Sequence, residues 1–478
     1  MGSGKLKSRS ETYFKTVPSM CRSCRKIVPA RVFFEQNNVF QQSLCPDCGC
    51  GRKTLIAADK EAYLTNYRRM TPDESPLPEA YPQKRGCPHD CGPCEAHASR
   101  CRLPVFSITN ACNLNCRHCF TYNRKDKLYF MSEDEMASTL ETMLKFSGGR
   151  VDLVNITGGE PTLHPNIFKL LDMCKRPEIG RITLNSNGIK LANDPKFCEE
   201  LAKRNIYVVL SLNELDEQKL RFFHPEQETA KIMAKTKRQA LANLKSAGVN
   251  VTLLNVLARD VNEGFANELL RLMLDNEHIL NLNFQTLTYT GQGGGSLAGA
   301  MQIPADEAVD ILVKHSDGRL RKSDFAPRRN AHFLCYQVCY CLKIKDELIP
   351  LRRFLTEAEL EQFTTDGYLL HCGNGKAFFQ NLIDRLYAEN ADDLCKVFRT
   401  MLDELFPSGG LSEMERQKRA EKFVRAIHIH AHMDEDNLDL SRLCACPDQV
   451  PTPDGKMISA CAYNLFYRMR DENFYVKA

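Results

Sequence analysis

The middle of the chain alternates short β-branched runs with helical stretches, and this alternation constrains the fold more than any other feature of the sequence. The helix expected from residue 133 is preceded by Ser132, with Glu135 at capping-box spacing. Repeated strand–helix units predict a parallel sheet with right-handed crossovers, and therefore an α/β fold. The runs with strand character cover residues 104–109, 151–157, 181–186, 206–213, 250–257 and 281–287.

Cysteine usage indicates metal binding. The chain has 22 cysteines and no tryptophan, and most of the cysteines stand in groups. Residues 1–14 are polar and lack the apolar core of a secretory signal, and no run approaches the roughly 18 apolar residues of a membrane helix. We therefore expect a cytoplasmic protein, either free or associated with a membrane surface, in which clustered thiols bind metal rather than form disulfides.

Composition and charge exclude two classes of protein. The 64 Lys and Arg residues nearly balance the 60 Asp and Glu residues, which argues against a dedicated nucleic-acid binder. A hydrophobic content of 43% argues against wholesale disorder. The Pro- and charge-rich stretch at 71–85 predicts a linker. We expect a metal knuckle at 1–70, a linker with an auxiliary metal-binding segment at 71–103, a barrel at 104–320 and a C-terminal auxiliary or substrate region at 321–478.

Three cysteines follow the first predicted strand in what we call the cluster loop, residues 109–120. Cys112, Cys116 and Cys119 are spaced to bind three irons of a cubane cluster and to leave the fourth iron open to a ligand. A structural zinc site would need a fourth donor, and His118 inside the C-x-x-C is poorly placed to supply it. Because such motifs stand at the carboxyl ends of the strands, we expect a partial (β/α)6 TIM-like barrel.

The C-x3-C-x2-C motif closed by the aromatic residue Phe120 resembles the radical S-adenosylmethionine (SAM) superfamily. The second predicted strand ends in Gly158-Gly159-Glu160-Pro161, which is similar to the GGEP segment of that superfamily. Two glycines would let the backbone approach a ligand, with exposed amides holding its polar end. The resemblance implies that this segment binds the amino group of the methionine moiety. It implies cofactor contacts also for Phe120 and for residues at the next strand ends, where ordinary turn chemistry is the alternative: Asn185, Ser186, Ser211 and Asn213.

The resemblance also implies the chemistry. An electron from a flavodoxin- or ferredoxin-type donor reduces the cluster, SAM is cleaved, and the 5′-deoxyadenosyl radical abstracts hydrogen from an unactivated carbon. The cofactor supplies the radical, and the protein supplies a dry cavity and the orientation of the substrate. An electron-transfer protein without enzymatic activity is the alternative, but it leaves the GGEP segment unexplained.

Two further cysteine groups precede the cluster loop. Four thiols spaced C-x3-C-x2-C-x6-C suit a cubane cluster or zinc, and we favour the cluster because it lies shortly before Cys112, where an electron must arrive. Two C-x-x-C pairs near the N-terminus match a rubredoxin-like or zinc-ribbon knuckle for one Fe or Zn ion, with Cys50 as an alternative to Cys48. The first group is Cys87, Cys91, Cys94 and Cys101, and the second is Cys21, Cys24, Cys45 and Cys48.

The C-terminal third offers donors for an additional auxiliary cluster, which would make two or three [4Fe-4S] clusters in total. His428, His430 and His432 alternate as one face of a strand requires, and they are substrate-site bases, metal ligands or a polar strand edge. The candidate cluster ligands are Cys335, Cys444, Cys446 and Cys461, with Cys339 and Cys341 nearby. We expect the isolated cysteines to pack as small buried hydrophobic side chains. They are Cys174, Cys198, Cys372 and Cys395.

The order of knuckle, G-C-P-x-D-C-G-x-C and cluster loop resembles the tetraether lipid synthases and the dihydropterin methylase-like radical proteins. The segments His430–Asp434 and Cys461–Asn464 look like the tail of that group. The resemblance implies carbon–carbon bond formation or alkylation of a lipid-like substrate, with methylation of a pterin-like small molecule or peptide maturation as alternatives. A lipid would need an apolar channel between the barrel mouth and the region after Gly291. The sequence departs from the group at Arg117-His118 and at the spacing of Cys444 and Cys446, which puts the substrate in doubt.

Overall fold

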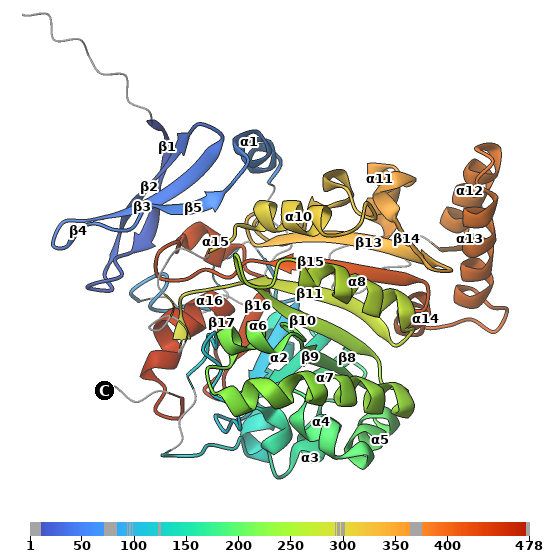
Figure 1. The fold of residues 1–478 in the computed structure, drawn as a ribbon, viewed down its shortest axis with the longest axis horizontal. Helices are drawn as coiled ribbons and strands as arrows, with labels where there is room; N and C mark the ends of the chain where they lie inside the picture. The colour runs from blue at the N-terminus through green and yellow to red at the C-terminus, as the bar shows by residue number, and fades with distance from the viewer. Residues whose placement is uncertain are drawn as a thin grey trace, which may run out of the picture.

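A twelve-stranded sheet occupies the centre of the molecule (Figure 1), in a computed structural model that describes residues 11–70, 84–92, 94, 97, 99–122, 126–291, 293, 297, 302–363 and 375–474. Its order is β12-β13-β15-β11-β10-β9-β8-β7-β6-β16-β17, and β14 pairs with β13. The strands are β6 (Leu103–Ser107), β7 (Val151–Thr157), β8 (Ile179–Ser186), β9 (Ile206–Ser211), β10 (Val251–Leu257), β11 (Ile279–Thr286), β12 (Ala326–Pro327), β13 (Tyr336–Ile344), β14 (Glu347–Pro350), β15 (Val424–His430), β16 (Asp448–Pro451) and β17 (Met457–Ser459).

The predicted α/β barrel strands are confirmed. β6 to β11 pair in sequence order and all in parallel, as right-handed strand–helix repeats require. The C-terminal region then extends both edges of this sheet. β15 pairs in parallel with β11, and β16 pairs in parallel with β6. The region at 321–478 therefore supplies walls of the barrel as well as its surroundings.

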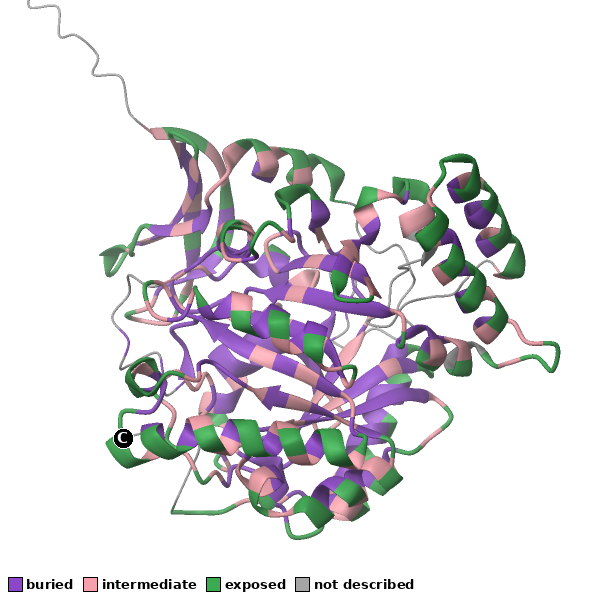
Figure 2. Ribbon diagram, turned by 45° about the vertical axis from the view of Figure 1, so that its right-hand side comes forward, coloured by how far each residue is buried: buried purple, intermediate pink, exposed green. Residues whose placement is uncertain are grey.

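Helices cover the outer face of the barrel strands, and Figure 2 shows exposed helix surfaces around buried strands. The predicted capping box is present: Ser132 Oγ accepts from the Glu135 amide at 3.2 Å, and Glu135 Oε2 accepts from the Ser132 amide at 2.7 Å. The barrel helices are α2 (Glu133–Ser147), α3 (Ile167–Met173), α4 (Ile189–Asn193), α5 (Pro195–Lys203), α6 (Glu217–Phe223), α7 (Gln227–Ala247), α8 (Phe265–Asp275) and α10 (Ala305–Lys314), with the short turn η1 (Pro161–Leu163).

A helical lobe and a C-terminal segment complete the molecule. In the lobe, Phe379 and Phe398 are fully buried between α12 and α13, which stand at the right edge of Figure 1. The lobe comprises α11 (Glu357–Phe363), α12 (Gly375–Ala388), α13 (Asp392–Leu405) and α14 (Glu413–Ala420). The remaining short elements are η2 (Lys322–Asp324), η3 (Leu351–Arg353), α15 (Leu440–Cys444), α16 (Ala460–Ala462), η4 (Tyr463–Tyr467) and η5 (Arg468–Arg470).

The N-terminal ribbon is a separate small sheet that lies beside α15 (Figure 1). The ribbon is attached to the segment after β15, because Gln41 Nε2 donates to the Leu438 carbonyl at 2.7 Å and Arg22 pairs with the buried Asp436 at 2.7 Å. Its elements are β1 (Glu11–Met20), β2 (Ile27–Glu35), β3 (Asn38–Cys45), β4 (Gly49–Cys50), β5 (Thr54–Ala57) and α1 (Lys60–Arg69).

Within the part of the chain that the structure describes, every helix is too short or too polar to cross a membrane.

Candidate active site

A cavity of about 320 Å³ lies at the carboxyl ends of the barrel strands, and the cluster loop forms one side of it. Cys112, Cys116 and Cys119 all line this cavity and are half-buried. Burial and the charges of the other two thiols raise the pKa of Cys116 well above its usual value. Three thiols that share one pocket repel one another when ionised, so the donor set fits a metal cluster that supplies positive charge.

Gly158 and Gly159 are required by the cluster loop. A Cβ on Gly158 would lie 2.4 Å from the Thr109 carbonyl oxygen, and one on Gly159 would lie 2.3 Å from that of Ala111. The structure also corrects the expectation that exposed amides here would hold a ligand. The Gly159 amide donates to Thr109 O and the Glu160 amide to Ala111 O, both at 2.7 Å. These glycines let two backbone segments meet, which fixes the cluster loop against β7.

Glu160 joins the ends of β7 and β8. Its carboxylate is 2% exposed and accepts from Ser186 Oγ at 3.0 Å, from the Asn187 amide at 2.7 Å, and from Thr162 Oγ1 at 2.7 Å. Burial raises the pKa of Glu160, and these donors act against that rise. Pro161 is buried and opens η1 directly after it. The carboxylate thus orders the loops beside the cavity, which Gly158, Gly159 and Glu160 help to line.

Three of the four predicted strand-end residues line the cavity. Asn185 and Ser211 line the cavity, as a cofactor contact would require, and Ser186 lines it while its Oγ donates to Glu160. Asn213 differs from the prediction, because its side chain is used inside the protein. Its Oδ1 accepts from the Val256 amide at 2.8 Å, and its Nδ2 meets His118 Nε2 at 3.1 Å. Asn213 therefore positions the cluster loop through His118 and does not face the cavity.

Stacked rings connect the cluster loop to β13. Phe120 stacks on His432 with centroids 5.5 Å apart, His432 lies 3.9 Å from His430, and His430 stacks on Tyr336 at 4.0 Å. His428, His430 and His432 all line the cavity. This inward placement argues against a polar strand edge and suits a role at the substrate site or as a metal ligand.

The histidines of this wall are neutral. Burial lowers the pKa of His430 to about 3, and that of His428 to about 3 as well. His430 Nε2 lies 3.4 Å from Asp448 Oδ2, and the Tyr336 hydroxyl donates to the same carboxylate. A buried carboxylate with an imidazole and a phenol offers hydrogen bonds, and a route for a proton, at the cavity wall.

Several cavity residues were not found from the sequence. Some of them alternate along β8 and β11, so inward-facing periodicity was the signal, but a polar inward face is unusual for barrel strands. Asn185 Oδ1 and Asn283 Oδ1 are buried and have no hydrogen-bond partner among the described residues. The residues missed include Arg181, Thr183, Asn281, Asn283 and Gln285 on these two strands, and Tyr336, Asp448, Asn464 and Arg468 elsewhere.

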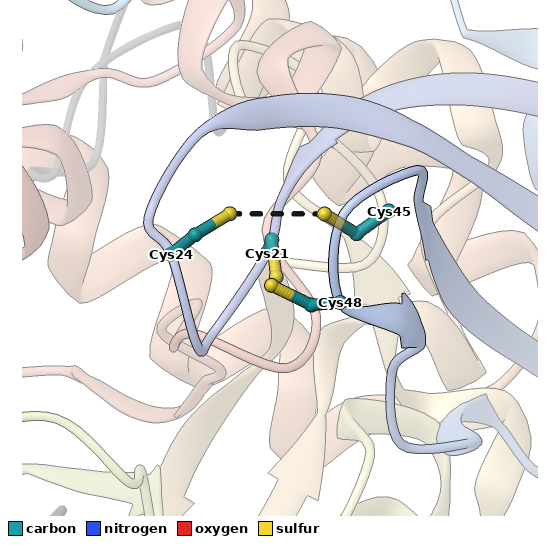
Figure 3. Close-up of side chains that lie close together, drawn as sticks. All are labelled: Cys21, Cys24, Cys45 and Cys48. Carbon is teal, nitrogen blue, oxygen red and sulfur yellow. Dashed lines mark hydrogen bonds between the residues drawn. The ribbon is translucent and has the colours of Figure 1, made fainter.

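The N-terminal cysteines form a site for a single metal ion. The Sγ atoms of Cys21, Cys24, Cys45 and Cys48 all lie within 4.8 Å of one another, and Figure 3 shows them converging. Cys24 Sγ and Cys45 Sγ are 3.7 Å apart, close to the ~3.8 Å that tetrahedral Zn–S bonds of about 2.3 Å impose. Cys48 and Cys50 are both exposed, but only Cys48 belongs to the group, so the structure favours Cys48 as the fourth ligand.

Removal of this site is expected to have a local effect. The Cys21→Ser/Cys24→Ser variant should lose about one metal ion per chain, because two of the four tetrahedral ligands are gone. Elemental analysis of the purified chain measures this, and thermal unfolding should show earlier melting of the ribbon. Cys50→Ser is the matched control and should keep the ion. Retention of the ion by the double variant, or its loss from the control, would contradict the assignment.

Cys444, at the end of α15, lies beside the cysteines that precede the cluster loop. A hydrogen bond with Cys444 is the largest cause of the raised pKa of Cys87, and burial raises the pKa of Cys91 to about 11 with contributions from Cys444 and Cys94. Burial and the charge of Asp448 raise the pKa of Cys101 well above its usual value, and the charge of Arg102 acts against that rise. We propose that Cys444 joins Cys87, Cys91 and Cys94 in place of the predicted Cys101. We call Cys87, Cys91, Cys94 and Cys444 the Cys87 group.

A second set of thiols lies around Asp448. Burial, Asp448, Cys461 and Cys335 raise the pKa of Cys446 well above its usual value. His432 Nδ1 lies 3.8 Å from Cys461 Sγ. We call Cys335, Cys446 and Cys461 the Cys461 group, and Cys101 and His432 are the further donors beside it.

The other cysteines pack as small side chains. Cys339 and Cys341 face each other at 3.5 Å within β13 and are fully buried. Cys174, Cys198 and Cys395 are buried in the core, as expected. Cys372 lies outside the described residues.

Comparisons with known proteins identify two parts of the chain. Residues 106–273 match the family model "Radical SAM superfamily", and residues 13–57 match "HMPTM N-terminal zinc ribbon domain". The chain is 25% identical to the 7,8-dihydro-6-hydroxymethylpterin dimethyltransferase of Methanocaldococcus jannaschii, over 96% of this chain and 95% of that protein. It is 28% identical to the GTP 3′,8-cyclase of Pasteurella multocida over 39% of this chain, and spans 53% of that protein. Streptococcus suis SuiB bound to its precursor peptide aligns with a TM-score of 0.37 at 21% identity, over 46% of each chain.

Proposed function

This chain contains a radical SAM domain and an N-terminal zinc ribbon, and we propose that it methylates a small pterin-like heterocycle. The observation that carries this proposal is the similarity to the dihydropterin dimethyltransferase, which runs through nearly the whole of both chains. It includes the ribbon and the C-terminal region as well as the barrel.

The cluster loop fits the cofactors that the family uses. Three thiols line one cavity, and the loop that holds them is fixed by backbone hydrogen bonds to Gly159 and Glu160. When bound there, a [4Fe-4S] cluster with SAM supplies a radical that abstracts hydrogen from carbon. The chain's own residues then have to orient the substrate and exclude water. We propose Asn185, Ser211 and Phe120 as cofactor contacts, and a flavodoxin- or ferredoxin-type electron donor.

The cavity supports a polar heterocycle. Asn185 and Asn283 place on its wall buried carbonyl oxygens that none of the described residues pairs with, and such acceptors suit the N–H groups of a pterin. The rings of Phe120 and His432 offer a flat apolar surface beside them. A buried acceptor left unmatched costs free energy, so a ligand that donates to it gains affinity and specificity.

The lipid version has less support. Apolar side chains such as Leu153, Val209 and Leu254 line part of the cavity, but polar side chains from β8, β11 and β15 interrupt this lining, whereas alkyl chains need an apolar tunnel. The predicted channel was to reach the region after Gly291, where residues 294–296 and 298–301 lie outside the described residues. The channel, the cytoplasmic location and peptide maturation stay predictions.

Anaerobic turnover tests the substrate. The reconstituted chain is incubated with SAM and dithionite, and with either 7,8-dihydro-6-hydroxymethylpterin or a cell lipid extract, each in deuterium-labelled form. We expect deuterium in 5′-deoxyadenosine only with the pterin, together with a methylated pterin product once a one-carbon donor is supplied. Mass spectrometry measures both.

Each arm has a matched control. A chain with Cys112, Cys116 and Cys119 replaced should transfer no deuterium from either source. Deuterium transfer from the lipid fraction alone would reject the pterin version and restore the lipid one. Transfer from neither, with 5′-deoxyadenosine still formed, would reject both substrates while leaving the radical chemistry in place.

A further inference from the structure

A buried arginine from the C-terminal segment lies at the cavity beside the cluster loop. Arg468, the first residue of η5, is 3% exposed and lines the cavity together with Ser107 and Cys119. Its Nη2 donates to Ser107 Oγ at 2.8 Å. Its Nε and Nη1 atoms are buried and have no hydrogen-bond partner among the residues that the structure describes. A guanidinium offers five N–H donors, so most of its capacity is unused here.

Two aromatic rings hold this side chain in place, and none of the described residues forms an ion pair with it. The guanidinium lies over the rings of Tyr463 at 5.1 Å and Phe474 at 4.7 Å. Burial lowers the pKa of Arg468, and the charges of Tyr463, Cys119 and Asp471 act against that shift. Burying a cation with unsatisfied donors is costly, and such a site is relieved when an anion binds.

We propose that Arg468 binds an oxyanion in the cavity, a carboxylate or a phosphate, next to Cys119. The planar guanidinium fork matches both groups, and a dry site strengthens the pairing. Two molecules can bring this chemistry: the methionine carboxylate of the cofactor, or an acidic group on the substrate. The inference rests on the proposed function for the identity of these molecules.

Binding measurements on the reconstituted holoenzyme separate the two sources. Three probes are titrated anaerobically: SAM, decarboxylated SAM and inorganic phosphate. If the cofactor carries the oxyanion, Arg468→Met should bind SAM about 10- to 100-fold more weakly and leave binding of the decarboxylated analogue unchanged. If the substrate carries it, phosphate should bind the native chain and not Arg468→Met, with SAM binding unchanged.

Stability distinguishes a binding role from a structural one. Without ligands, Arg468→Met should melt at the same temperature as the native chain or higher, because it removes an unsatisfied buried cation and keeps most of the volume. Arg470→Ala removes an exposed cation from the same η5 turn and should change neither binding nor melting. Lower stability of Arg468→Met with native affinity for all three probes would overturn the proposal.

Two further outcomes are decisive. If Arg468→Met does not fold, Arg468→Lys replaces it, since it keeps the charge and loses the fork. At least severalfold weaker binding of SAM or phosphate then supports the proposal, and unchanged binding of both overturns it. None of these measurements requires turnover. A chain that binds its oxyanion through Arg468 but forms no 5′-deoxyadenosine would therefore contradict the proposed function alone.

Discussion

Replacing Cys112, Cys116 and Cys119 by alanine is expected to reduce the formation of 5′-deoxyadenosine from SAM to background. The three thiols line one cavity and are the three cysteines of the cluster loop. Each single alanine variant should lose nearly as much activity as the triple variant, because ligands of one cluster act as a unit. Chromatography of the reaction under dithionite measures the nucleoside, and iron analysis should show about four irons fewer per chain.

The fold should survive this change. The three cysteines are half-buried in a loop, whereas the sheet core is made of residues such as Phe106, Val154 and Leu184. Circular dichroism should therefore match the native chain. The Cys21→Ser/Cys24→Ser variant is the control for loss of a metal-binding pair, and it should still form 5′-deoxyadenosine. Loss of cleavage from that variant with its iron–sulfur clusters still loaded would contradict the separation of the ribbon from the radical chemistry.

The sequence predicts the barrel and the cluster loop because both depend on local patterns. Strand and helix periods are readable within one segment, and the three cluster ligands stand within eight residues of one another. The same reasoning does not separate the possible uses of a glycine. Gly158 and Gly159 fit a ligand approach as well as a backbone approach, and only the position of Thr109 and Ala111 decides for the second.

Contacts between residues far apart in the sequence were the main feature that the sequence did not predict. Asn213 stands at a strand end where a ligand contact is expected, yet the folded chain brings His118 and the Val256 amide to it. Arg468 is more than a hundred residues beyond the last predicted barrel strand and gave no pattern of its own. Cys101 follows Cys94 closely in sequence, but α15 brings Cys444 against Cys87 instead. Proximity along the chain is weak evidence for shared ligation when a later segment can return to the same site.

Replacing Cys444 by alanine is expected to remove one whole auxiliary cluster, about four irons and four sulfides per chain. Cys444 and Cys87 share a hydrogen bond, and the charge of Cys444 acts on Cys91. A Cys91→Ala/Cys444→Ala variant should lose no more iron than either single variant, because both ligands belong to one cluster. Iron and sulfide analysis with Mössbauer spectroscopy measures the content. Cys395→Ala is the control: this thiol is buried in the helical lobe and should hold no iron.

Cys101 provides the contrasting case. Its thiol lies by Asp448, near the Cys461 group, so Cys101→Ala should leave the Cys87 group loaded. If Cys101 completes the Cys461 group, a Cys91→Ala/Cys101→Ala variant should lose about eight irons rather than four. If His432 completes it instead, Cys101→Ala keeps all its iron and His432→Ala loses about four. The structural grouping would be wrong if Cys91→Ala and Cys101→Ala removed the same four irons while Cys444→Ala kept them, because ligation would then follow the order of the sequence.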